Sequence, residues 1–220
     1  VSETDSFIDE VNEEVRRDRL YAALRRYGWI AIVAVLAIVG GAAFNEYRRA
    51  SDLALAHQRG DAILQALESD TGESRSAALG EIATEGSAVS ALVGLFRASE
   101  LVMMQDPAAA SDVLAALIGQ ESISGDYSDL ALFKQLLLEG SGLDASARRS
   151  GFEQLSAAGN PLRLLAQEQL ALLDLQENDE TAAVKRLRDL LQDAEMTQNL
   201  RQRLGQLMVA LGQDPNALDG

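Results

Sequence analysis

The chain has 220 residues, with 19 Lys and Arg against 34 Asp and Glu, a formal net charge of −15 and no cysteine. This charge argues against nucleic acid as a partner, because phosphate binding requires a concentrated basic face. The lack of cysteine excludes disulfides, thiolate zinc sites and a cysteine nucleophile. One uncharged apolar run, residues 28–44, stands out from an otherwise polar sequence and excludes a plain cytosolic globule.

Residues 1–26 are expected to form a short cytosolic amphipathic segment. Ser6 followed by Asp9 is typical of a helix N-terminus, and apolar residues recur around them at roughly helical spacing, namely Phe7, Ile8, Val11 and Val15. We expect this helix either to dock on the cytosolic face of a partner or to prolong the membrane helix with one side on the interface.

The apolar run predicts a single transmembrane helix over residues 27–47. Its core of 17 residues spans roughly 25 Å as a helix, slightly less than the roughly 30 Å hydrocarbon core of a bilayer. Aromatic rings and arginines at both ends supply the missing length as membrane-interface anchors: Arg25, Arg26, Tyr27, Trp29, Tyr47, Arg48 and Arg49.

A cleaved signal peptide is the competing interpretation of this run, because the small residues Gly41, Ala42 and Ala43 resemble a processing site. The 26 residues before the run include seven acids, unlike the short basic region of a signal peptide. We therefore favour a retained anchor.

The arginines around the membrane helix predict its orientation. Five arginines precede it closely in the sequence and three follow it, so the positive-inside rule favours a cytoplasmic N-terminus. Within the helix, Ala34, Ala37 and Gly41 fall at i, i+3 and i+7. This stripe of small residues is a candidate helix-packing face, although small residues are also common in membrane helices without such a role.

The sequence after the membrane helix predicts an all-α domain over residues 48–212, followed by a tail at 213–220. No stretch alternates β-branched and polar residues over the length of a strand, and Gly, Asn, Asp and Pro mark the breaks. The expected helices are Ala50–Ser69, Ser74–Thr84, Ser87–Gln105, Pro107–Ile118, Tyr127–Glu139, Asp144–Ala157, Pro161–Gln176, Glu180–Asp193 and Met196–Leu211.

A faint internal repeat of about 35 to 38 residues runs through these helices. Two units align at a shift of 73 residues: Ala98, Ala110, Leu114 and Leu117 with Ala171, Ala183, Leu187 and Leu190, while Leu136 and Phe152 take the places of Ala98 and Leu114 in a middle unit. Small residues at helix crossings favour a degenerate tetratricopeptide-like helix-hairpin solenoid with a concave acidic surface.

The sequence offers little for catalysis or for a metal or cofactor. His57 is the single histidine, and no nucleophile elbow or Walker A sequence occurs. Residues 174–180 resemble a calcium loop but lack its required Gly and Glu. The arginines at 148–149 and 185–188 lie among acids and are expected to form i, i+4 surface pairs. We therefore expect no enzyme, no cofactor, no metal and no small-molecule substrate.

The organisation as a whole resembles the YfgM family, over essentially the entire chain. The resemblance is carried by the acidic cytosolic segment, the sequence RRYGW before a Gly-containing membrane helix, FNEYRRA after it, and the tetratricopeptide-like domain. It implies an ancillary subunit of the bacterial SecYEG translocon, with its soluble domain in the periplasm beside a membrane-anchored prolyl isomerase. It also implies chaperone-like handling of exported proteins. We carry over no substrate-contacting residue.

Together these features predict a single-pass protein of the bacterial inner membrane whose periplasmic domain binds exported envelope proteins near the translocon. The alternative is an accessory or assembly subunit of another inner-membrane complex, respiratory or for cytochrome maturation. In that case the membrane helix would carry the specificity through Ala34, Ala37 and Gly41. An enzyme relying on acids alone is the weakest option.

Overall fold

A computed structural model describes residues 3–82 and 87–214 of the chain. These residues are helical and contain no strand, which confirms the all-α prediction for the part that the structure describes. The chain divides into two compact units, Val1–Gln58 and Arg59–Gly220.

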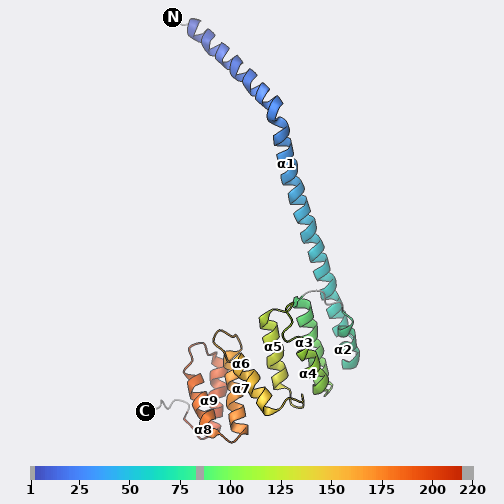
Figure 1. Cartoon of the computed structure of the whole chain (residues 1–220), viewed down its shortest axis with the longest axis vertical. Coiled ribbons are helices and arrows are strands. Elements are labelled where there is room, and N and C mark those ends of the chain that lie inside the picture. Colours follow the sequence, from blue (N-terminus) through green and yellow to red (C-terminus); the bar gives the residue numbers. More distant parts are fainter. Residues whose placement is uncertain (1–2, 83–86, 215–220) are drawn as a thin grey trace. The chain divides into compact units, whose positions relative to one another are not determined.

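The first helix, α1, is longer than expected and runs without a break from Glu3 to Leu67 (Figure 1). The sequence left open whether the N-terminal segment prolongs the membrane helix, and it predicted a separate helix from Ala50 onward. No proline occurs in it, and the polar stretch 45–52 consists of residues that a helix tolerates. The helix therefore continues where a change from apolar to polar composition predicted a boundary.

The unit Arg59–Gly220 contains the last turns of α1 and the remaining described helices. These are α2 (Gly72–Gly80), α3 (Ser87–Met103), α4 (Pro107–Ala115), α5 (Gly125–Leu137), α6 (Ala145–Leu155), α7 (Arg163–Gln176), α8 (Glu180–Leu191) and α9 (Gln198–Ala210). Each lies within a few residues of a predicted helix. At their N-termini, α2 and α5 begin two residues earlier than expected, α6 begins one residue later, and α7 and α9 begin two residues later.

Polar side chains start most of these helices. Thr71, Asp106, Asp144, Asp179 and Thr197 each accept a hydrogen bond from the backbone N–H three residues later, at the N-termini of α2, α4, α6, α8 and α9. Such caps satisfy an N–H group that the helix itself leaves free.

Left-handed residues follow α3, α4, α5, α6, α7 and α9. At three of them, Gln105, Asn178 and Gly212, φ lies between 60° and 71°, and the N–H of the next residue donates to the carbonyl oxygen five residues before it, at the ends of α3, α7 and α9. Gln105 and Asn178 are each followed directly by an aspartate that caps the next helix. The same backbone turn thus recurs, even where the residue at the turn is not glycine.

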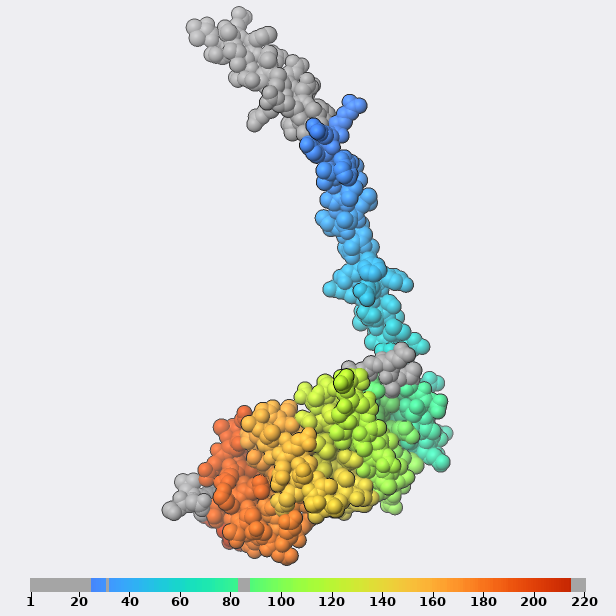
Figure 2. Space-filling view, in the orientation of Figure 1, coloured from blue at the N-terminus to red at the C-terminus, as the bar shows by residue number. Residues whose placement is uncertain are grey.

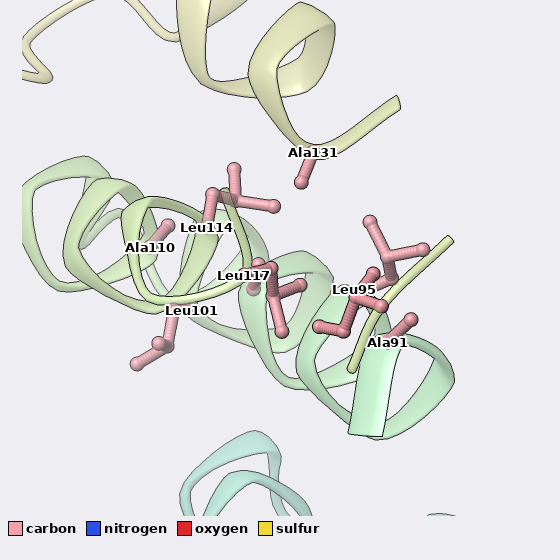
Figure 3. Packing of buried hydrophobic residues seen from close by; sticks show 9 residues of the cluster. Ala91, Leu95, Leu101, Ala110, Leu114, Leu117 and Ala131 are labelled. Atoms are coloured by element: carbon pink, nitrogen blue, oxygen red, sulfur yellow. The ribbon is translucent and has the colours of Figure 1, made fainter. Parts of the chain in front are cut away.

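The helices pack mainly on their neighbours in the sequence, with α3 also touching α5. Figure 2 shows the same order on the surface, where α3 to α9 succeed one another from green to red. The core is correspondingly a succession of clusters and not one centre. In the cluster of α3, α4 and α5, Leu95, Leu114 and Leu117 gather where the helices meet, and Ala131 faces them from α5 (Figure 3).

The residues aligned by the repeat register are all buried. Ala98, Ala110, Leu114 and Leu117 in the first unit and their counterparts 73 residues later are core residues, as are Leu136 and Phe152 between them. The alignment therefore identifies core positions correctly.

Candidate protein-interaction site

An open apolar pocket of about 350 Å³ lies between α3 and α5. It is lined by Ala98, Ser99, Val102, Met103, Leu114, Lys134, Leu137 and Leu138. Pockets of this size and apolar character are typical of binding sites.

Large apolar side chains around the pocket face solvent. Met103 is 73% exposed, Val102 43% and Leu137 40%. Leu92 and Phe96 continue the exposed stripe on α3, since residues 92, 96 and 103 share one face of a helix. An accessible apolar patch of this kind indicates an interaction surface. We call the exposed side chains Leu92, Phe96, Val102, Met103 and Leu137, with the pocket they border, the α3/α5 face.

Two exposed carboxylates lie in the chain just beyond one end of this pocket. Asp106 follows α3 and Glu139 follows α5. A Cβ built on Gly140 would come within 3.2 Å of Pro107 Cγ, so the backbone beside Glu139 approaches the residue beside Asp106. Asp106 accepts a hydrogen bond from the Ala109 N–H at 3.0 Å. Among the described residues, neither carboxylate forms an ion pair with a basic side chain.

The helices from α6 onward are joined instead by ion pairs. Asp174 on α7 is buried and accepts hydrogen bonds from Arg149 Nη2 at 2.9 Å and Arg186 Nε at 3.1 Å. Glu168, also buried, accepts from Arg203 Nε at 2.6 Å. These carboxylates are removed from water and depend on the guanidinium groups for compensation.

This arrangement corrects the expected pattern of i, i+4 surface pairs. Lys185 forms such a pair, with Asp189 at 3.0 Å. Arg149 and Arg186 reach from α6 and α8 to the shared Asp174. The guanidinium group spans helices because its donors are spread in a planar fork on a long side chain.

A polar contact recurs where α2 meets α3, α4 meets α5 and α6 meets α7. Arg75 pairs with Glu100, Gln135 donates to Ser111 Oγ at 3.0 Å, and Arg149 pairs with Asp174, with 25, 24 and 25 residues between partners. The middle contact is uncharged. The geometry recurs although the residue types differ, which is why the sequence alone did not reveal it.

Hydrogen bonds lower the pKa values of two carboxyl groups in the helices from α6 onward. Hydrogen bonding to the Arg163 guanidinium, and then to the Glu195 N–H, lowers the pKa of Asp193 below its ordinary 3.8. The pKa of Asp144 is lowered by the Ala147 N–H that it caps and by the Ser146 hydroxyl. Both carboxylates are thus stabilised in the charged form.

The residues singled out for the membrane segment all lie on α1. Ala34, Ala37 and Gly41 are exposed, as are the anchors Arg25, Arg26, Tyr27, Trp29, Tyr47, Arg48 and Arg49. The Arg26 guanidinium lies 5.8 Å from the Tyr27 ring centroid, and that of Arg48 lies 5.6 Å from the ring of Phe44. Among the described residues, α1 is the one helix long and apolar enough to cross a membrane. The roles of the stripe and of the anchors stay predictions.

The titratable groups form no recognisable catalytic or metal centre in the described ranges. His57 is exposed on α1, and no group of three or more His, Asp or Glu is placed to share a metal ion among the residues searched. Asp174, the first residue of the calcium-loop-like stretch, is occupied by Arg149 and Arg186. The site with the clearest chemical character is therefore the α3/α5 face.

Sequence reasoning missed this face. Periodicity places its apolar residues on helices but does not distinguish a core face from a groove. Comparisons with protein-family models, with curated proteins and with solved structures found no match.

Proposed function

We propose that this chain is a single-pass protein of the bacterial inner membrane, with a cytoplasmic N-terminus and a periplasmic helical unit that binds other proteins. In this proposal it is ancillary to the SecYEG translocon and assists the handling or folding of exported envelope proteins. The observation that carries the proposal is the α3/α5 face, an exposed apolar surface on a chain that also contains a membrane-length helix.

The membrane assignment is supported by the exposure of α1. The 18-residue apolar window in α1 has none of its residues buried. Leu36 and Ile38 are 65% and 72% exposed. Water would solvate such a surface at high cost, whereas the hydrocarbon of a bilayer accommodates it. The cytoplasmic placement of the N-terminus rests on the excess of arginines before the apolar run.

The proposal includes a degenerate tetratricopeptide-like array for α3 to α9. Support comes from packing between sequence neighbours, from the buried residues aligned at a shift of 73 residues, and from the shared left-handed turn after α3, α7 and α9. Helix-hairpin arrays present extended surfaces on which partners bind. The α3/α5 face lies on the first helices of two successive hairpins in this array.

Anchoring and binding would act together. A helical unit tethered beside the site where chains emerge meets them at high effective concentration, so weak contacts with an apolar surface are sufficient for capture. Met103, which lines the pocket, has a flexible and polarizable side chain that adapts to different apolar partners.

The test is photo-crosslinking in cells from two positions of the full chain. A crosslinking residue at Ala37 reports the neighbour in the membrane, and one at Met103 reports what touches the α3/α5 face. We expect translocon subunits from Ala37 and exported proteins from Met103, with few adducts from the exposed Asp179 as a control site.

Two results would contradict the proposal. Adducts from Ala37 to a respiratory or cytochrome-maturation complex, without exported proteins at Met103, would favour an assembly subunit of that complex. Accessibility of the helical unit to a membrane-impermeant reagent only from the cytoplasmic side would reverse the proposed orientation.

A further inference from the structure

We infer that the α3/α5 face binds segments in which apolar side chains are followed closely by Lys or Arg, with the basic group held at the end of the pocket near Asp106 and Glu139. This inference rests on the proposed function, because it names the chemical class of the protein segments that the face would take. It is argued from the charges around the pocket.

The pocket itself selects apolar side chains. Seven of its eight lining residues are uncharged, and five carry large aliphatic or thioether groups: Val102, Met103, Leu114, Leu137 and Leu138. Burying a side chain of a partner against them removes apolar surface from water, the main favourable term in such an association.

Lys134 is the one charged residue that lines the pocket, and its position in α5 gives it a role within that helix. It lies in the last turn of α5, where a positive charge compensates the negative end of the helix dipole. The last turn of α3, by contrast, has no basic residue. Its C-terminal end at Met103 borders the pocket and retains its partial negative charge.

The two carboxylates reinforce this negative end. Asp106 lies three residues beyond the end of α3, and Glu139 lies two residues beyond the end of α5. The contact between Gly140 and Pro107 brings their two chain segments together. Both side chains are exposed, so a cation brought by a partner can reach them. A Lys or Arg beside the apolar residues of that partner would meet two carboxylates next to a helix end that has no basic residue in its last turn.

The sequence around the pocket also carries a net negative charge. Residues 87–143 contain two basic residues, Arg97 and Lys134, against seven acidic ones. A segment with an acidic flank would therefore be repelled along the whole region, while a basic flank would be attracted to it. The apolar pocket and the charged end together require both features in one partner.

The test uses the full chain in nanodiscs of zwitterionic lipid and three short labelled peptides. The peptides share one apolar core and differ only in two residues after it, which are Lys, Gln or Glu. Fluorescence anisotropy gives each affinity, and empty nanodiscs correct for partition into lipid. We expect the Lys peptide to bind most tightly and the Glu peptide most weakly, with a difference that shrinks as salt is raised.

The variants locate the charge effect. Asp106→Asn with Glu139→Gln removes both charges, and asparagine keeps the helix cap that Asp106 provides for α4. We expect the Lys peptide to lose about fivefold in affinity, as for the loss of about 1 kcal/mol from exposed pairs. The Gln peptide should bind as before.

A matched control removes the same charge elsewhere. Asp179→Asn with Glu180→Gln changes the corresponding cap of α8, 73 residues later, and should leave all three affinities unchanged. Met103→Asp should abolish binding of every peptide, whereas Val209→Asp, at another exposed apolar residue on α9, should not.

Three outcomes would overturn the inference: equal affinities for the three peptides, an equal loss in the control double variant, or unchanged binding by Met103→Asp. Equal affinities with loss of binding in Met103→Asp would leave the proposed apolar site intact and remove only the preference for basic flanks. Failure of the proposed function would appear separately, in the crosslinks from Ala37 and Met103 in cells.

Discussion

The α3–α5 region (residues 87–143) and the α6–α9 region (residues 144–214) are built on similar turns but differ in what holds and covers them. The α3–α5 region exposes seven large apolar side chains, namely Leu92, Phe96, Val102, Met103, Met104, Tyr127 and Leu137, whereas the α6–α9 region exposes only Val209 among its described residues. Ion pairs between helices are more numerous in the α6–α9 region, where arginines bind Asp174, Glu168 and Asp193, whereas in the α3–α5 region Glu100 pairs with Arg75 of α2.

The two regions place their polar groups differently. In the α6–α9 region, buried carboxylates form ion pairs with arginines of neighbouring helices. In the α3–α5 region, the corresponding contact between Gln135 and Ser111 is neutral, and the carboxylates at Asp106 and Glu139 remain at the surface. The α6–α9 region therefore uses its carboxylates between helices, whereas the α3–α5 region leaves Asp106 and Glu139 at its surface.

The largest expected effect comes from truncating a core aromatic residue. Phe152 is fully buried and packs edge to face on Phe133, with ring centroids 5.8 Å apart. Phe152→Ala should destabilise the α6–α9 region by about 3–5 kcal/mol through the cavity it leaves. Hydrogen exchange of the full chain followed by mass spectrometry measures this locally; the single Trp29 lies in α1 and would not report it. Phe96→Ala, on the α3/α5 face, is the control and should cost less than about 1 kcal/mol.

A smaller effect is expected from removing the shared carboxylate. Asp174→Ala leaves Arg149 and Arg186 without their buried partner and should cost about 2–3 kcal/mol, discounted for the partial exposure of both arginines. Gln135→Ala at the neutral contact should cost about 1 kcal/mol. The same exchange experiment would show the difference, and equal losses would mean that charge adds nothing to this junction.

Acid should weaken the α6–α9 region before the α3–α5 region. The pKa of Asp193 is lowered in the folded protein by Arg163, so its contribution to stability is present above the ordinary value of 3.8 and is lost as pH falls through the lower folded value. Exchange at α7 to α9 should therefore rise as pH drops below about 4. Asp193→Asn should flatten that rise; an unchanged pH profile in this variant would assign the acid sensitivity to other groups.

The smallest effect on stability is expected on the α3/α5 face. Met103→Asp changes a side chain that is 73% exposed, so unfolding free energy should change by about 0.5 kcal/mol or less. In this variant, photo-crosslinking of partner proteins from positions next to residue 103 should nevertheless fall strongly. A large loss of stability would show that Met103 belongs to the core and would remove the contrast between the two regions.

Most of the fold could be predicted from local sequence signals. The turn after α3 has Asp106 followed by Pro107, and the turn after α7 has Asp179 as a cap, so both hairpins begin and end close to the predicted residues. The eight residues aligned at a shift of 73 are core residues because small and large apolar side chains must alternate where helices cross. Each of these features depends on residues within one or two helical turns of each other, so the local sequence is sufficient to predict it.

The site could not be predicted in the same way, since it depends on which helix faces meet. Met103 and Leu137 are of the same residue types as many core residues, and their exposure follows from how α3 packs beside α5. The reach of Arg149 and Arg186 to Asp174 likewise crosses helices and has no fixed spacing in the sequence. The continuity of α1 was missed because a change of composition was taken as a break, although the backbone requires none.

Packing between sequence neighbours also determines the order in which this unit can fold. Because α3 finds its main partners in α2, α4 and α5, its core can close before the last helices are available. Contacts that are short in sequence close with little loss of chain entropy and form quickly. The helical unit can thus fold progressively from its N-terminal end as the chain is supplied, and each new helix finds a completed surface on which to pack.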